Sequence, residues 1–373
     1  MSHAVKIVFR TDASLQIGTG HVMRCLTLAE ALKKEGAQCH FISREHPGNL
    51  FDQIKQQGFI VKALPATTKE MFFDDSNNAV HSEYASWLGT SWTTDAEQTK
   101  SSIGNTVYDW LIVDHYALDE KWEKELRPKC RNIMVIDDLA DRSHDCDLLL
   151  DQNLGRDQNH YNQIVPKNCT VLTGPHYALL RPEFAALRDY SLRRRVNPKF
   201  KHLMISMGGV DQINATGKIL EAIKECELPN YLRITVVMGL NAPWLLQVKS
   251  LAEQLPQSTE VMVNVQNMAQ LMTDSDLAIG AAGSTSWERC CLGLPSIIVI
   301  LAENQQFIAN SLQSAGAAKT FSINDDVNAL GKIIKKMIGN TNEAPKMSAV
   351  AASITDGNGI NKITTKLQAM THI

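Results

Sequence analysis

The start of the chain decides its fold: Val5-Lys6-Ile7-Val8-Phe9 is followed by Arg10-Thr11-Asp12-Ala13-Ser14-Leu15-Gln16-Ile17-Gly18-Thr19-Gly20-His21-Val22-Met23-Arg24-Cys25. Residues 5–9 form an apolar run that predicts a strand, and residues 26–32 have the apolar spacing of a helix. The polar loop between them ends in Gly-Thr-Gly-His. Backbone N–H groups at such a turn, with the positive end of the helix dipole, favour an anionic ligand. Because His21 lies at this helix start, the stretch predicts a site for chemistry on an anion.

The position of His21 predicts a general base. The helix dipole and Arg24, one turn later on the same face, both disfavour the protonated imidazole. We therefore expect a neutral imidazole that accepts a proton near pH 7. A histidine that only caps or packs the helix is the alternative, but the flanking glycines and Asp12 favour function.

The composition excludes several classes of protein. With 373 residues and a net charge of −3, the chain is long enough for two domains and has no large basic field for nucleic acid or anionic membranes. No apolar run approaches the roughly 20 residues that span a bilayer, and the N-terminus lacks the features of a signal peptide. The eight cysteines show no C-x-x-C spacing and lie mostly in apolar segments, which is typical of reduced thiols. We expect a cytoplasmic monomer that binds neither nucleic acid nor membrane.

Strand-like and helix-like segments alternate along most of the chain, which predicts parallel strands joined by crossover helices. A polar, arginine-rich stretch at residues 193–199 interrupts the alternation and is predicted to be a solvated linker. The predicted domains are residues 1–195, which carry the histidine, and residues 196–355. A helix within residues 356–373 is expected to pack on the first domain.

Apolar runs bounded by polar turns predict thirteen strands, seven before the linker and six after it. The segment 66–105 is the exception, because it is polar and irregular, and we expect a partly helical excursion on the domain surface. The predicted strands lie at residues 5–9, 38–42, 59–63, 110–113, 132–136, 148–150, 170–172, 202–206, 233–238, 261–263, 276–279, 296–300 and 317–320.

Ligands of open parallel sheets bind at the carboxyl ends of the strands, so the loops there are the most informative. Gly208 and Gly209 precede a helix and suit a close approach to phosphate, although an ordinary turn explains them equally well. Residues 280–288 combine a small-residue turn with the hydroxyls of Ser284 and Thr285 at a helix start. Free N–H groups and hydroxyls at this second place are suited to a diphosphate.

Further polar residues belong to the candidate site at residues 280–288. Glu288 lies one turn into the helix, within reach of a ribose diol. Asn304 and Gln305 follow the next strand, and their amides supply donors and acceptors for sugar hydroxyls. The alternative for residues 280–288 is a helix-capping loop without a ligand. The alternative for Asn304 and Gln305 is a simple polar helix start.

Carboxylates also end two strands of the first half, in Asp114-His115-Tyr116 and in Asp137-Asp138. Both places are expected to face a cleft between the domains. Because Asp137 and Asp138 are adjacent, their side chains point to opposite sides of the strand, which argues against a glycosidase pair of carboxylates. The sequence contains no serine nucleophile elbow, zinc-binding helix motif or P-loop.

Together these motifs resemble the GT-B nucleotide-sugar enzymes, the group of the peptidoglycan N-acetylglucosaminyltransferase. Within that group, the chain is closer to the UDP-2,4-diacetamido-2,4,6-trideoxy-β-L-altropyranose hydrolases of pseudaminic acid biosynthesis. At Asn304 the glycosyltransferase motif has an arginine, and this departure favours the hydrolases. The resemblance spans about residues 5–320. Its motifs are Arg-Thr-Asp-Ala-Ser (10–14), Gly-Thr-Gly-His (18–21), Val-Asp-His-Tyr (113–116), Ile-Asp-Asp-Leu-Ala (136–140), His-Asp-Cys-Asp-Leu-Leu-Leu-Asp-Gln-Asn (144–153), Gly-Pro-His-Tyr-Ala-Leu-Leu-Arg (174–181), Met-Gly-Gly-Val-Asp (207–211), Gly-Ala-Ala-Gly-Ser-Thr-Ser (280–286), Gly-Leu-Pro (293–295) and Ala-Glu-Asn-Gln (302–305).

The resemblance implies an α/β fold of GT-B type, with two Rossmann-type parallel-sheet domains that face each other across a cleft, the second of which binds UDP. It implies hydrolysis of the sugar C1–O bond to UDP and 2,4-diacetamido-2,4,6-trideoxy-L-altrose, with His21 deprotonating water and with neither metal nor cofactor. The alternatives are a GT-B glycosyltransferase with a UDP-amino-sugar donor and a non-catalytic nucleotide-sugar binder. Turnover is expected to require closure of the domains. Substrate contacts are expected at Asp12, Gly20, Arg24, Tyr116, Arg181, Gly208, Gly209, Met238, Ser284, Thr285, Glu288, Asn304 and Gln305.

Overall fold

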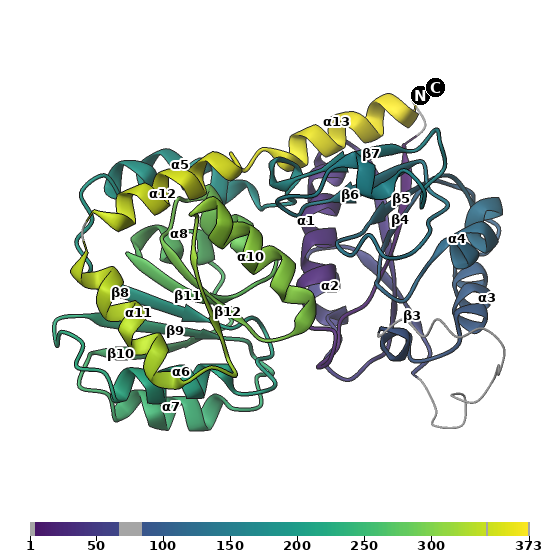
Figure 1. Cartoon of the computed structure of the whole chain (residues 1–373). Helices are drawn as coiled ribbons and strands as arrows, with labels where there is room; N and C mark the ends of the chain where they lie inside the picture. The colour runs from purple at the N-terminus through teal and green to yellow at the C-terminus, as the bar shows by residue number, and fades with distance from the viewer. Residues whose placement is uncertain (1–3, 67–83, 341, 372–373) are drawn as a thin grey trace. The chain divides into compact units, whose positions relative to one another are not determined.

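A computed structural model describes residues 4–66, 84–340 and 342–371, and they form two α/β units (Figure 1). Unit 1 comprises Met1–Leu179 and Ile360–Ile373, and unit 2 comprises Leu180–Gly359. Each unit contains one sheet in which all strand pairs are parallel. The predicted fold class, two Rossmann-type parallel-sheet domains, is therefore confirmed.

The sheet of unit 1 has seven strands in the order β3-β2-β1-β4-β5-β6-β7. The order reverses between β1 and β4, and such a switch point is where open α/β sheets bind ligands. The strands are β1 (Lys6–Thr11), β2 (Gln38–Arg44), β3 (Ile60–Leu64), β4 (Tyr108–Asp114), β5 (Cys130–Ile136), β6 (Leu148–Asp151) and β7 (Thr170–Thr173). The helices are α1 (Gly20–Lys34), α2 (Phe51–Gln56), η2 (Ala85–Leu88), α3 (Trp92–Ile103), α4 (Glu120–Leu126), η3 (Arg127–Lys129), η4 (Gln158–Tyr161), η5 (Pro175–Tyr177) and α13 (Gly359–Thr371).

Both faces of this sheet are buried, because successive residues of β1 belong to different apolar clusters. Ile7 and Phe9 lie in a cluster with side chains of α1 and α13, whereas Val8 lies in a cluster with side chains of α3 and α4. Helix α13, drawn in yellow in Figure 1, comes from the far end of the chain. Trp110 Nε1 donates a hydrogen bond to Thr371 Oγ1 at 2.8 Å. The C-terminal helix thus completes the core of unit 1.

The sheet of unit 2 has six strands in the order β10-β9-β8-β11-β12-β13, with the same kind of reversal between β8 and β11. The strands are β8 (His202–Ser206), β9 (Arg233–Met238), β10 (Thr259–Val263), β11 (Leu277–Ala281), β12 (Ser296–Ile300) and β13 (Lys319–Ser322). The helices are α5 (Pro182–Arg194), α6 (Ala215–Lys224), α7 (Leu245–Glu253), α8 (Met268–Asp274), α9 (Thr285–Cys291), η6 (Glu303–Gln305), α10 (Gln306–Ala315), α11 (Val327–Gly339) and α12 (Glu343–Ile354). Every one of the thirteen predicted strands overlaps an observed strand.

The excursion expected at residues 66–105 is helical where the structure describes it. The short helix η2 and the longer helix α3 lie in its second half, and residues 67–83 lie outside the described residues. Ser91 accepts a hydrogen bond from Thr94 N at 3.1 Å, so a hydroxyl caps α3 at its start. Its buried residue Ala96 joins the cluster beneath the sheet, which fixes this segment on unit 1.

The boundary between the units differs from the expected one at residue 195. The chain passes from unit 1 to unit 2 at Leu179–Leu180, and α5 belongs to unit 2, where it packs against α8 and α9. Residues 193–199 are therefore not a linker between the units, because the first two of them end the packed helix α5 and the rest follow it within unit 2. A run of basic residues has no apolar periodicity, so the sequence pattern missed the end of this helix.

The arginines of the expected linker hold α5 in place instead of contacting only solvent. Arg195 is 4% exposed. Its guanidinium donates to the carbonyl oxygens of Met272, Ser275 and Leu292 at 2.9, 3.0 and 3.1 Å. Burial next to Arg194 lowers the pKa of Arg195 to about 9, which still leaves it charged near neutral pH.

Arg195→Ala is expected to lower the free energy of unfolding by about 3 kcal/mol, because three carbonyl groups lose their buried donor. The matched control is Arg193→Ala, because Arg193 is exposed. It is expected to change the free energy of unfolding by less than about 0.5 kcal/mol. Urea denaturation followed by circular dichroism measures both. Equal and small effects in the two variants would support the solvated linker that we have rejected.

Candidate functional site

The loop after β1 is a tight turn that leads into α1. Gly18 N donates to Ser14 O at 2.9 Å, and Ser14 Oγ accepts two further backbone N–H groups. Gly18 has a φ of +81°, a conformation that glycine adopts without steric cost. Helix α1 begins at Gly20, and no side chain caps its start at Thr19. No side chain caps its first N–H groups, so the predicted binding of an anion there remains a prediction.

The side chain of His21 is held by Asp114, the last residue of β4. His21 Nδ1 and Asp114 Oδ1 are 2.6 Å apart, and the Asp114 side chain is fully buried. An ionised carboxylate only accepts hydrogen bonds, so in the neutral imidazole Nδ1 carries the proton and Nε2 the lone pair. No described residue makes a hydrogen bond to Nε2, and the His21 side chain is 10% exposed. A carboxylate that orients an imidazole with a free Nε2 is the arrangement of a general base.

Arg24 fixes the same carboxylate. Its Nε and Nη2 donate to Asp114 Oδ2 and Oδ1 at 2.6 and 2.7 Å, and its Nη1 donates to Asp138 at 2.5 Å. Burial alone would raise the pKa of Asp114, but Arg24 and His21 outweigh it and hold that pKa well below its usual range. Arg24 lies beside His21, and its positive charge is paired with Asp114 and Asp138.

Aromatic rings border the imidazole. The Tyr116 ring lies edge-on to His21, with centroids 4.6 Å apart, and its hydroxyl donates to Asp138 Oδ2 at 2.9 Å. Burial and the Asp138 charge raise the pKa of Tyr116 far above its usual value, so the hydroxyl stays protonated. Trp87 of η2 stacks on Tyr116 at 5.7 Å and lies 6.3 Å from His21.

Asp12 lies in a buried ion network and has no exposed surface. Its Oδ1 accepts from Arg10 Nη1 at 2.6 Å and from Arg44 N at 2.7 Å. Arg10 also donates to Asp95 of α3 at 2.7 Å. Burial opposes ionisation of Asp12, but Arg10 and two neighbouring histidines hold its pKa well below the usual range. The expected substrate contact is not available to a fully buried carboxylate, so Asp12 positions the loop by tying β1, β2 and α3 together.

In unit 2, the loop after β8 is occupied by the protein itself. Gly208 and Gly209 form the expected turn, with a φ of +93° at Gly208. The carboxylate of Asp211 accepts from the N–H groups of Ala215 and Thr216, both at 2.8 Å. Because these are the first residues of α6, the start of that helix is already paired with an anion and is not free to bind a phosphate.

The loop after β11 is built around a buried arginine. Arg289 of α9 is 3% exposed and donates to the carbonyl oxygen of Ala281 at 2.9 Å. A Cβ at Gly280 would lie 2.3 Å from its Nη1, so a larger residue there would displace the guanidinium. Burial lowers the pKa of Arg289 to about 10, so it is charged near neutral pH. Ser284 and Thr285 begin α9 next to this charge, and no side chain caps the helix.

Glu288 is half-buried one turn into α9 and makes no hydrogen bond to a described residue. Burial raises its pKa to about 7, and the charge of Arg181 offsets part of this effect. Arg181 precedes α5 and pairs with Glu183 at 3.0 Å. An unpaired carboxyl near the switch point of the sheet is available to a polar ligand.

Three other predicted residues lie at a strand end of unit 2 or in the loop that follows one. Asn304, after β12, is exposed and makes no hydrogen bond to a described residue. Gln305 accepts from Leu301 N at 3.0 Å, so its amide is fixed by its own loop. Met238 is 2% exposed within the core of unit 2. The expected contact of Met238 with substrate is therefore not supported, because its side chain offers no surface to a ligand.

The structure brings the predicted residues together in two groups, one in each unit. His21, Arg24 and Tyr116 meet in unit 1, and Ser284, Thr285 and Glu288 lie on α9 in unit 2. The sequence had marked Asp114 only as a carboxylate at a strand end, and this position was the available signal. The sequence gave no signal for Trp87, because only tertiary packing places η2 beside β4.

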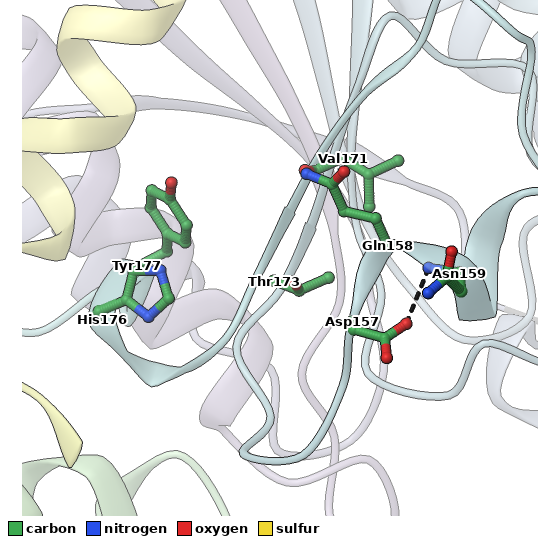
Figure 2. A pocket seen from close by; sticks show the side chains of 7 residues that line it. All are labelled: Asp157, Gln158, Asn159, Val171, Thr173, His176 and Tyr177. Atoms are coloured by element: carbon green, nitrogen blue, oxygen red, sulfur yellow. Dashed lines mark hydrogen bonds between the residues drawn. The ribbon is translucent and has the colours of Figure 1, made fainter.

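A depression of about 450 Å³ lies in unit 1, apart from the group around His21 (Figure 2). It lies beside β7, the edge strand of unit 1. Three strands of the sheet separate β7 from β1. The candidate site is therefore located by the chemistry of His21 and not by this depression. The lining residues are Asp157, Gln158, Asn159, Val171, Thr173, His176 and Tyr177.

The described part of the chain lacks two kinds of feature. Within residues 4–66, 84–340 and 342–371, no cluster of three or more His, Cys, Asp or Glu side chains is arranged to hold a metal ion. Over the same residues, no helix has both the length and the apolar character needed to cross a membrane.

The fold defines the class of protein. A crystal structure of Acinetobacter baumannii MurG matches with a TM-score of 0.66 and 16% sequence identity, over 98% of this chain and 99% of that one. Residues 207–361 match the glycosyltransferase family 28 C-terminal domain. The chain thus has the GT-B fold, and unit 2 contains a domain of the family 28 type.

Relatives of known sequence are more specific. The chain is 26% identical over 313 residues to the UDP-2,4-diacetamido-2,4,6-trideoxy-beta-L-altropyranose hydrolase of Campylobacter jejuni, over 84% of this chain and 97% of that protein. It is 27% identical over 305 residues to an uncharacterized protein of Methanocaldococcus jannaschii, over 81% of this chain. The matched region spans 56% of the length of this second relative.

The raised pKa of Glu288 predicts a pH-dependent stability. The folded state binds the Glu288 proton more tightly than the unfolded chain, in which the ordinary glutamate pKa is 4.5. The wild type therefore loses stability as the pH rises from about 4.5 to about 7. Glu288→Gln cannot ionise, so its free energy of unfolding relative to wild type should rise by about 3 kcal/mol over this interval and then level off. Urea denaturation at several pH values measures the difference, and a constant difference would contradict the burial of this carboxyl.

Proposed function

We propose that the protein hydrolyses UDP-2,4-diacetamido-2,4,6-trideoxy-β-L-altropyranose at the sugar C1–O bond, as a step of pseudaminic acid biosynthesis. The products are UDP and 2,4-diacetamido-2,4,6-trideoxy-L-altrose. The observation that carries the proposal is the pair of His21 and Asp114, with Nε2 of the imidazole free of hydrogen bonds to described residues. The named Campylobacter relative and the family 28 domain in unit 2 support the choice of substrate.

In unit 1, His21 is the general base. Its Nε2 takes a proton from water while the water oxygen forms a bond to C1 of the sugar. The C1–O bond to the diphosphate breaks, and its electron pair leaves with UDP. The ionised Asp114 stabilises the imidazolium that forms, and Arg24 keeps Asp114 in place. The proton then returns to solvent, which restores the base.

In unit 2, the start of α9 binds the diphosphate. The open N–H groups at Ser284 and Thr285 and their hydroxyls donate to phosphate oxygens. The buried charge of Arg289 beneath this turn stabilises the negative charge that develops on the leaving UDP. Glu288 accepts hydrogen bonds from the ribose diol, and the exposed amide of Asn304 is available to the sugar.

The remaining expectations belong to the same proposal. By the resemblance to the hydrolases, we propose that turnover needs no metal and that the protein acts as a cytoplasmic monomer. Activity after treatment with EDTA tests the first point, and size-exclusion chromatography with light scattering tests the oligomeric state.

The decisive experiment is the incubation of the UDP-sugar with the protein and no acceptor. A hydrolase releases UDP and free sugar, whereas a glycosyltransferase, whose fold the chain shares, releases UDP only when an acceptor is added. A binder without catalytic activity retains the intact UDP-sugar. Chromatographic measurement of UDP separates the three functions.

His21→Asn is expected to lower kcat by at least about a hundredfold, the usual contribution of one general base. The Kd for UDP should stay within about twofold of the wild-type value, because the base contributes to chemistry and not to nucleotide binding. His160→Asn, an exposed histidine of η4, is the matched control and should leave kcat unchanged. Near-normal turnover in a folded His21→Asn protein would remove His21 from the mechanism.

Glu288→Ala is expected to weaken the binding of UDP and of the UDP-sugar by the same factor, about tenfold, because both ligands lose the same ribose contact. Isothermal titration calorimetry with the two ligands measures this, with the His21→Asn protein used for the UDP-sugar so that it is not consumed. A loss confined to the UDP-sugar would place Glu288 against the sugar instead of the ribose.

A further inference from the structure

Three aromatic side chains form a cluster next to the proposed base. Trp87 and Tyr116 are stacked, with an interplanar angle of 22°, and the Tyr84 ring lies edge-on to both, at 4.7 Å from Trp87 and 5.2 Å from Tyr116. The Trp87 ring also meets His21 nearly at a right angle, at 76°. Tyr84 and Trp87 come from the irregular segment before α3, so a segment without any recognised motif reaches the imidazole.

Buried neighbours hold this segment in a defined place. Leu88, the residue after Trp87, lies in the apolar cluster under the sheet with Val8 and Ile42. A few residues later, Asp95 of α3 accepts hydrogen bonds from Arg10, Arg44 and Trp122, all of them buried. The residues that follow Trp87 are therefore fixed by packing and by ion pairs, as expected for a segment that shapes a site.

Trp87 keeps a free surface although its neighbours are covered. Tyr84 and Leu88 are buried, whereas Trp87 is half-buried. No described residue accepts a hydrogen bond from its indole N–H. Beside the His21 ring, the indole thus presents an apolar face and an N–H donor that no described residue uses.

We propose that Trp87 is a specificity-determining residue that binds an acetamido group of the sugar. The methyl group packs on the indole ring, and the carbonyl oxygen accepts from the indole N–H. This inference rests on the proposed function, because it assumes that the sugar of the UDP-sugar lies beside His21. It adds a substrate contact that neither the motifs nor the relatives assign.

The chemistry of the two groups matches. An acetamido group has one apolar end and one strong acceptor, and the exposed indole has one apolar face and one donor. A sugar with hydroxyl groups at these positions would place polar groups against the ring and lose hydrogen bonds to water. Trp87 would therefore favour acetamido sugars over hydroxylated ones.

The test compares Trp87→Ala and Trp87→Phe with Trp92→Ala. Trp92, five residues later, is 37% exposed at the start of α3 and provides a matched control. For the UDP-sugar, Trp87→Ala should raise KM and lower kcat/KM by about 10- to 100-fold, because the ring contact is lost. Trp87→Phe keeps an apolar ring without the donor and should recover most of the lost kcat/KM. Its kcat/KM should be about 2- to 10-fold below that of the wild type. Trp92→Ala should match the wild type.

The inhibition constant of UDP, which has no sugar, separates binding of the sugar from a general loss of structure. It should stay within about twofold in all three variants, and the melting temperature should stay close to the wild-type value. If Trp87→Ala leaves kcat/KM unchanged, or weakens UDP as much as the UDP-sugar, Trp87 does not bind the sugar. A fall in kcat alone, fully restored by phenylalanine, would show a purely structural role and overturn the proposal.

The failure of the proposed function has a different signature. If the wild type binds the UDP-sugar but releases no UDP, hydrolysis is excluded, and calorimetry of the UDP-sugar and UDP on wild type and Trp87→Ala tests the contact alone. If Trp87→Ala binds the UDP-sugar more weakly than the wild type does but binds UDP equally well, the role of Trp87 is supported. If both proteins bind the UDP-sugar with equal affinity, the role is overturned. A wild type that binds no UDP-sugar would overturn both.

Discussion

The carboxylate of Asp114 is the group on which the proposed site depends. It is fully buried, and it accepts hydrogen bonds from His21 and Arg24 at 2.6–2.7 Å. An isolated buried carboxylate is costly, and the arginine makes the ionised form favourable. The ionised form in turn fixes the tautomer of the imidazole and leaves Nε2 for chemistry. Arg24 therefore contributes through Asp114, and Asp138 completes the charge balance by binding both Arg24 and Tyr116.

The two units use the same sheet reversal in different ways. In unit 1, the helix that follows β1 supplies His21 and the end of β4 supplies Asp114, and no side chain caps the start of α1. In unit 2, Asp211 occupies the start of α6 after β8, and the open turn is the one after β11. A carboxylate at a helix start excludes a phosphate from it by charge and by occupying its donors. This pairing directs the proposed phosphate site to α9.

Buried charge also explains features that look polar and exposed in the sequence. Arg10, Asp12 and Asp95 form a network without exposed surface that joins two strands to α3. Arg195 ties α5 to unit 2 through three carbonyl groups. In both cases an arginine replaces the apolar contacts by which helices usually pack, and its several donors satisfy groups that would otherwise be buried without partners. This is why charge runs were poor guides to surface and linker.

The sequence by itself determined the thirteen strands, their parallel arrangement, and the loops around His21 and Ser284, because apolar runs and glycine turns are local signals. The tertiary structure decided which charges are paired. It brought Asp114 to His21 across 93 residues of sequence, gave Asp12 a buried positioning role, moved the unit boundary to Leu179–Leu180, and placed Trp87 beside the imidazole. These outcomes depend on contacts between residues far apart in the chain, and local patterns carry no record of which distant partner neutralises a buried charge or covers a ring.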